Sequence, residues 1–249
     1  MKKTKWILVA FASTLTLFGC AHGRSASVWL ADVQNPFVGH WESEIPSMGY
    51  AKLVSEYRND GTFTCDFPDH PEFGGPFAGG YSVSDDILIG WLDFEGASAY
   101  KFKAVDNDTI DVTEINGVNE RGELELGNTA PFVRVAGFAV NKENKPLSVN
   151  NVFMGSKWKS QIPSMNNAEM VSEYKADGTF ACGFPDIPGY EGPFNGAYLV
   201  FEDKMASWLD FEGIAAYKFV VNANNTINVT EFDDMEEGNT SVFTRIENE

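Results

Sequence analysis

The sequence predicts an all-β protein that contains two copies of one domain. Short runs rich in aromatic and β-branched residues alternate with turn sequences such as Asn59-Asp60-Gly61 and Asp177-Gly178, a pattern typical of strands joined by tight turns. No stretch carries a sustained helical stripe of apolar residues. Each copy holds about eight such runs, at the even spacing that indicates a β-sandwich or a barrel.

The internal repeat is the clearest feature of the chain. Residues 41–115 align without a gap on residues 158–232, at a constant offset of 117. The hexapeptide Trp-Leu-Asp-Phe-Glu-Gly, for example, occurs at 91–96 and again at 208–213. Similarity this dense at a fixed offset indicates duplication within one gene.

The first nineteen residues have the character of a signal peptide. Lys2, Lys3 and Lys5 precede an apolar stretch over 6–18, which is too short for a membrane-spanning anchor. The following Leu17-Phe18-Gly19-Cys20 resembles the lipobox of bacterial lipoproteins. That resemblance implies acylation of Cys20 and attachment to a membrane of the cell envelope, for which we expect the outer membrane. An ordinary secretory signal, cut after another small residue, is the alternative.

These features divide the chain into five segments. We expect a signal peptide at 1–19, a tether at 20–34, the first repeat at 35–136, a polar linker at 137–150 and the second repeat at 151–249. Each repeat has an ordinary domain size. The first repeat also carries a longer acidic segment over 117–127, which we expect to be a loop.

The net charge of the chain excludes nucleic acid as a partner. The formal net charge of the chain is −18, and removal of the three lysines in 1–19 makes it −21. A chain this acidic repels nucleic acid and anionic lipid. We therefore expect no nucleic-acid partner.

Strands in the first repeat are expected to begin at regular intervals, with alternate side chains facing inward. The expected starts lie near His40, Ala51, Thr62, Phe77, Ile87, Ala99, Thr109 and Ala130. The aromatic side should face the interior, where it either packs as a core or lines a ligand cavity. The candidate ligand-binding residues are Leu53, Tyr57, Phe63, Tyr81, Tyr100 and Phe102, together with Met170, Tyr174, Phe180, Tyr198, Tyr217 and Phe219.

Two charged residues per repeat alternate in phase with the apolar side. These charges suggest interior ion pairs, Glu114 with Arg134 and Glu231 with Arg245. The alternative is that all four lie at strand ends in water.

Short motifs at the repeat ends resemble those of the lipocalin-like proteins. Gly39-His40-Trp41 fits the Gly-x-Trp motif of the first strand, and Arg134 fits the arginine near the end of the last strand. In the second repeat Arg245 matches, but Gly155 and Trp158 are one residue further apart. The Thr-Asp-Tyr motif of larger lipocalins is absent. The resemblance implies two eight-stranded up-and-down barrels in which each arginine stacks on a tryptophan, so Trp41, Arg134, Trp158 and Arg245 would be structural.

The residues usual in catalytic centres are scarce. The three histidines, His22, His40 and His70, have no histidine counterparts in the second repeat, which excludes a duplicated histidine-based site. Cys65 and Cys182 are expected to be buried and inert. No metal-ligand spacing or nucleophilic triad is present. We expect neither enzymatic activity nor a cofactor or metal.

The shared hexapeptide provides the one candidate for a charged site. Trp91, Asp93 and Glu95 alternate on one face, and Trp208, Asp210 and Glu212 repeat them. If that face is interior, the six residues form two candidate cation-binding sites. The alternative places Leu92 and Phe94 in the core and the acids in water.

Three functions remain open at this point. The first is a membrane-anchored lipoprotein that binds or carries a small hydrophobic or amphipathic molecule. The second is a surface interaction module with solid barrels, which contacts another protein through its acidic faces and loops. The third, weaker, function is an enzyme that uses the Asp93 and Glu95 carboxylates.

Overall fold

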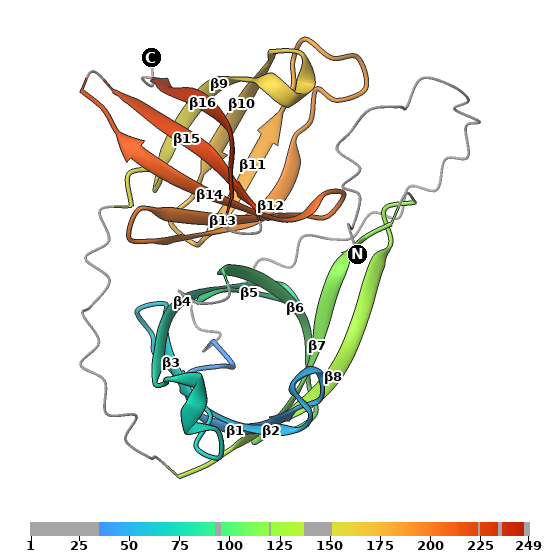
Figure 1. The fold of residues 1–249 in the computed structure, drawn as a ribbon. Coiled ribbons are helices and arrows are strands. Elements are labelled where there is room, and N and C mark those ends of the chain that lie inside the picture. Colours follow the sequence, from blue (N-terminus) through green and yellow to red (C-terminus); the bar gives the residue numbers. More distant parts are fainter. Residues whose placement is uncertain are drawn as a thin grey trace.

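The computed structural model describes residues 35–92, 96–119, 121–136, 151–223, 225–233 and 236–246, which form two closed eight-stranded barrels (Figure 1). All strand pairs are antiparallel between neighbours in sequence, and the first strand of each barrel also pairs with its last. The predicted all-β fold with two up-and-down barrels is confirmed. Cys20 and the segments 1–19, 20–34 and 137–150 lie outside the described residues.

The strands of the two barrels correspond one to one. The first barrel contains β1 Gly39–Ile45, β2 Ala51–Tyr57, β3 Thr62–Asp66, β4 Phe77–Ser84, β5 Ile87–Leu92, β6 Gly96–Ala104, β7 Thr109–Val118 and β8 Leu124–Arg134. The second contains β9 Ser156–Ile162, β10 Ala168–Tyr174, β11 Thr179–Gly183, β12 Phe194–Phe201, β13 Lys204–Leu209, β14 Gly213–Val221, β15 Thr226–Asp233 and β16 Glu236–Ile246. Short 3-10 turns lie at η1 Pro46–Met48, η2 Pro71–Phe73 and η3 Pro163–Met165. Among the described residues, no helix has the length and apolar character needed to span a membrane.

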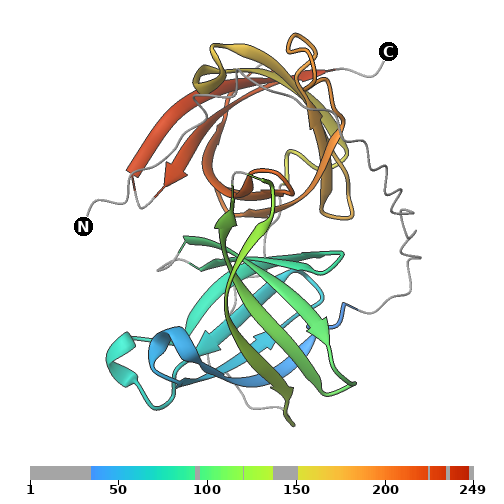
Figure 2. The ribbon, with the colours of Figure 1, turned by 90° about the vertical axis from the view of Figure 1, so that its right-hand side faces the viewer.

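Strand β8 begins earlier than the sequence indicates. It starts at Leu124 rather than near Ala130, and β7 continues to Val118. Much of 117–127 is therefore an extended hairpin rather than a loop. Register shifts near Ile115 interrupt the ladder, and the hairpin runs beyond its own barrel towards the second repeat in both views (Figures 1 and 2).

The two barrels pack against each other through equivalent strands. Strand β4 lies against β12, β5 against β13 and β6 against β14, as in the self-complementary interface of a two-fold dimer. The barrel axes are not parallel, because Figure 1 looks into the first barrel and Figure 2 into the second. The contact is a shared apolar cluster with a core of Ile87, Ile89, Trp91, Ala99, Ala197, Leu199, Ala206 and Trp208.

This contact explains why β5 is apolar on both sides. Leu88 faces into the first barrel, whereas Ile89, the next residue, is fully buried between the barrels. Apolar residues of the extended hairpin, Ile115, Val118 and Leu124, pack against the same inter-barrel cluster. The hairpin thus adds to the contact between the repeats.

Candidate functional site

The first barrel contains a cavity of about 120 Å³. Alternation along the strands supplies its wall, because every second side chain points inward. Strand β5, for example, contributes Leu88, Gly90 and Leu92. A Cβ atom at Gly90 would meet no atom within 4 Å. This glycine therefore leaves part of the interior empty.

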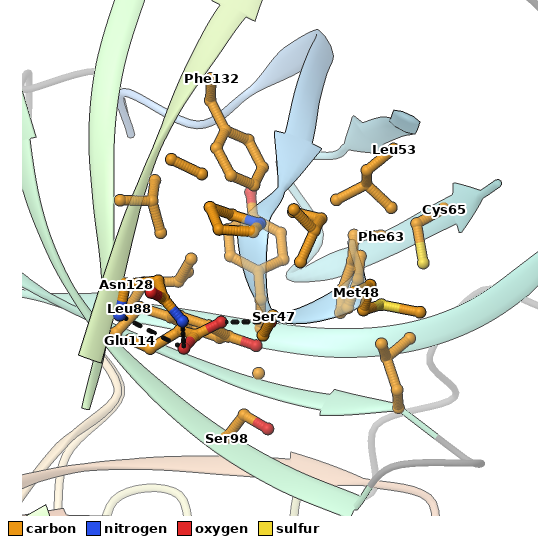
Figure 3. Close-up of a pocket in the computed structure, with 18 of the residues that line it drawn as sticks. Ser47, Met48, Leu53, Phe63, Cys65, Leu88, Ser98, Glu114, Asn128 and Phe132 are labelled. Carbon is orange, nitrogen blue, oxygen red and sulfur yellow. Dashed lines mark hydrogen bonds between the residues drawn. The ribbon is translucent and has the colours of Figure 1, made fainter. Parts of the chain in front are cut away.

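Most of the cavity wall is apolar or aromatic. Buried and half-buried side chains from all eight strands surround the space, among them Leu53, Phe63, Cys65, Leu88 and Phe132 (Figure 3). Tyr57 stacks on Phe63 with ring centroids 5.0 Å apart. Burial, with smaller contributions from Cys65 and Tyr100, raises the pKa of Tyr57 well above its usual value, so its phenol is neutral at physiological pH.

One end of the cavity reaches the surface, and we call this end the mouth. It is bordered by Ser47 and Met48 of η1, Glu114 of β7 and Asn128 of β8, of which all but the half-buried Glu114 are exposed. The Glu114 carboxylate accepts a hydrogen bond from Ser47 Oγ at 2.6 Å. It also accepts bonds from the Asn128 side chain at 3.3 Å and backbone N–H at 3.4 Å (Figure 3).

The Glu114 carboxylate is the only charge among the described cavity-lining residues. Among the described residues, its hydrogen-bond donors at the mouth are an alcohol and two amide groups, all of them neutral. These donors therefore hold the carboxylate in place at the edge of an apolar space without offsetting its negative charge.

The opposite end of the barrel is closed, and we call it the floor. Phe37, fully buried, packs against Tyr57 and Phe102 and accepts a hydrogen bond from Trp41 Nε1 through its backbone carbonyl at 2.6 Å. The Arg134 guanidinium lies 4.3 Å from the centroid of the Trp41 ring. It donates to the carbonyls of Val38 at 2.8 Å and Pro36 at 3.1 Å. These contacts give Trp41 and Arg134 the structural role expected of them.

In the second repeat the corresponding tryptophan has a different hydrogen-bond partner. Arg245 is exposed, although its backbone pairs with Trp158, and no stacking of its side chain on that indole is seen in the described part of the chain. Ser156 stands where the first repeat has Gly39. Its hydroxyl accepts a hydrogen bond from Trp158 Nε1 at 2.7 Å and donates one to the Phe153 carbonyl. The expected structural role is thus retained by Trp158 but passes from Arg245 to Ser156.

The inward face assigned from sequence is correct for all twelve candidate ligand-binding residues. In the first repeat Leu53, Tyr57, Phe63, Tyr81 and Tyr100 line the cavity, whereas Phe102 belongs to the floor beside Phe37. The six candidates of the second repeat belong to or pack against its core; they are Met170, Tyr174, Phe180, Tyr198, Tyr217 and Phe219. Their positions inside the barrels leave ligand binding by these residues a prediction.

Both repeated cysteines are buried within their barrels, as expected. Burial, followed by the nearby Glu212 carboxylate, raises the pKa of Cys182 to about 11. A thiol with that pKa is almost entirely protonated at neutral pH and is a poor nucleophile.

The expected ion pairs between Glu114 and Arg134 and between Glu231 and Arg245 are wrong. In an antiparallel hairpin the end of one strand meets the start of the next. Glu114, in the second half of β7, therefore meets Asn128 in the first half of β8 at the mouth, while Arg134, the last residue of β8, lies at the floor. In the second repeat Glu231 similarly accepts a bond from the Asn239 side chain at 3.4 Å.

The hexapeptide does not place its tryptophans inside the barrels. Trp91 and Trp208 are buried between the repeats, so neither indole can contact a ligand in a barrel cavity. Lys204 of the second repeat lies 5.8 Å from the centre of the Trp91 ring. Asp93, Phe94 and Glu95 lie outside the described residues.

The second copy of the hexapeptide shows where its acids lie. Asp210 is exposed and accepts a hydrogen bond from Trp208 Nε1 at 3.3 Å. Glu212 also retains contact with water, but surrounding atoms desolvate its carboxylate and, with Glu231 nearby, raise its pKa above the usual value. Leu209, which directly precedes Asp210, faces inward and joins the core. In the described ranges, no group of three or more His, Cys, Asp or Glu side chains is arranged to hold a metal ion.

Similarity to other proteins gives no further assignment. The chain matches no protein-family model and no curated protein sequence.

Sequence reasoning missed two features of this site. The first is the cavity, part of which is left open because Gly90 has no side chain; its counterpart in the second repeat is Ser207. The second is the mouth, where Ser47 and Asn128 hold the Glu114 carboxylate.

The contact between the barrels was also missed. The apolar run of β5 was the available signal for it, since continuous hydrophobic strands indicate burial on both faces.

Proposed function

We propose that this protein is a non-enzymatic binding protein of the cell envelope, which holds a small molecule in its first barrel. The observation that carries the proposal is the cavity of about 120 Å³ with its mouth at Ser47 and Met48. Anchoring through an acylated Cys20 is part of the same proposal and rests on the resemblance of residues 17–20 to a lipobox.

The size of the cavity limits the guest. Pockets for drug-sized ligands commonly measure about 300–1,000 Å³, whereas an apolar cavity of roughly 150 Å³ accepts benzene. At about 120 Å³, the first barrel suits a molecule, or one end of a molecule, close to a single aromatic ring in size. A complete lipid does not fit this volume.

Filling the cavity from its wall tests the proposal. In Gly90→Leu the new side chain enters open space, so the barrel should fold normally and exclude the guest. We expect toluene to bind the parent saturably and to lose at least tenfold in affinity for Gly90→Leu, as followed by backbone amide shifts in NMR spectra. Val133→Leu is the control, because Val133 is exposed on β8.

Two outcomes would count against the binding function. The first is the absence of saturable binding by the parent, and the second is unchanged binding by Gly90→Leu. Native mass spectrometry of protein gently extracted from its source cell complements the titration, since a carrier retains its natural guest.

A further inference from the structure

We propose that the first barrel selects a small organic cation, a molecule with an apolar body and a protonated amine, whose ammonium group is bound by Glu114. This inference rests on the proposed binding function and names the chemical class of the guest. It follows from where Glu114, the one charged residue among the described lining residues, lies relative to the apolar cavity.

The geometry of the mouth supplies the first step. Glu114 borders the same space as Leu53, Tyr57 and Phe63, so a guest within the cavity lies beside its carboxylate. The carboxylate accepts bonds from Ser47 and Asn128, which fix its position. A carboxylate has about four lone-pair sites, and it therefore retains capacity for a donor from the guest.

Charge supplies the second step. A protonated amine would give Glu114 a charge-assisted hydrogen bond, which is roughly twice as strong as a neutral one. The described lining residues include no Lys, Arg or His that could neutralise Glu114 or bind a carboxylate. A fatty acid or other anionic guest would consequently place two negative charges side by side.

The aromatic wall and the total charge favour the same class of guest. Tyr57, Phe63 and Tyr100 border the cavity, and their ring faces attract cations. The formal charge of −18 on the chain raises the local concentration of cations and lowers that of anions around it. The charge of the chain attracts a cationic guest before it enters the mouth, and the aromatic rings attract it inside the cavity.

Three probes of one shape separate charge from apolar burial. Benzylamine, toluene and benzoate share one ring and are cationic, neutral and anionic at pH 7. We expect the full mature chain to bind benzylamine at least tenfold more tightly than toluene, and benzoate more weakly than either. Isothermal titration calorimetry at low salt measures all three affinities.

A neutral replacement assigns the preference to its residue. Glu114→Gln keeps the shape of the side chain and removes its charge, so we expect benzylamine to lose at least tenfold in affinity while toluene is unchanged. Asp111→Asn is the matched control, because Asp111 is on the same strand but its side chain points to the opposite side from Val112. The control should leave all three affinities as they are.

The results distinguish this proposal from the one on which it rests. Equal binding of toluene and benzylamine, tighter binding of benzoate, or equal losses of both ligands in Glu114→Gln would overturn the amine preference and leave the cavity function intact. Failure of all three probes to bind would overturn both. The ranking by the parent chain decides between these outcomes even if Glu114→Gln does not fold.

Discussion

A single glycine accounts for the different floors of the two barrels. Gly39 has φ +134°, and a Cβ atom at this position would collide with Arg134 Nη1. In the second repeat the equivalent residue is Ser156, and Arg245 is exposed. The glycine thus makes room for the Arg134 guanidinium, which lies over the Trp41 ring and donates hydrogen bonds to two backbone carbonyls.

Gly39→Ser should therefore destabilise the first barrel by about 1–3 kcal/mol, because it displaces Arg134 and strains a backbone with positive φ. Arg134→Ala should cost a similar amount, about 1–3 kcal/mol, through the lost hydrogen bonds and cation–π contact. Urea denaturation of each variant measures these losses.

The double variant checks that the two residues act through one contact. Since both changes remove the same guanidinium contacts, their combined cost should be clearly smaller than the sum. Strict additivity would show that Gly39 does not act by making room for Arg134. Arg134→Lys should not restore stability, because an ammonium cannot stack on the indole and reach both carbonyls in the same way.

For single residues, the sequence predicts well which side of a strand a side chain faces. It predicts less well which other residue that side chain contacts. Alternation correctly placed Tyr57 and Glu114 on the inward side, because facing depends only on the strand period of two. The partner of Glu114 depended on how far β7 and β8 extend. The longer hairpin and its register shifts are not indicated by the local sequence, so the partner could not be predicted from it.

Strands β4, β5 and β6 have two buried faces where they meet the second barrel. Gly80 on β4 lies opposite Leu199 and Phe201 across the contact, and an added Cβ would approach both within 3.1–3.2 Å. The backbone of this strand is thus brought close to β12. Any larger residue at Gly80 must displace side chains of the other repeat.

Gly80→Leu should weaken the contact between the repeats and lower the free energy of unfolding by about 1–3 kcal/mol, a typical cost of overpacking. Small-angle X-ray scattering should show a larger radius of gyration while circular dichroism retains the β signal. Gly90→Leu is the matched control, since its added side chain enters the cavity. Equal effects of the two substitutions would argue against tight packing between β4 and β12.

The sequence indicated the strands closely but not the contact between the barrels. Seven of the eight expected starts in the first repeat lie within three residues of the observed ones, because turn residues and alternation are local signals. The inter-barrel contact is not local. Trp91 alternates in phase both with Asp93 and Glu95 and with Ile87 and Ile89, and only the structure shows that this face is covered by the second barrel.

The proposed membrane attachment belongs to the whole molecule. Cys20→Ser should release the protein from the membrane fraction, because one acylated residue supplies the anchor. Globomycin, which blocks lipoprotein signal peptidase, should leave the precursor uncleaved. Fractionation and immunoblotting measure both effects, and unchanged membrane association of the Ser variant would exclude the lipid anchor.

The duplicated architecture limits how this protein can acquire a new ligand. Between Ile87 and Trp91, alternate residues of β5 are committed to the cavity and to the neighbouring repeat. A single side chain such as that of Gly90→Leu can fill the pocket from this strand, but a shift of the β5 backbone that widens the pocket also disturbs the contact with the other barrel. Strands β2 and β7 instead place residues such as Lys52 and Asp111 on the side away from the cavity, where they are only half-buried. Natural variants that alter ligand preference should therefore accumulate on those strands. Under selection for a new guest, the wall next to the second repeat should change last.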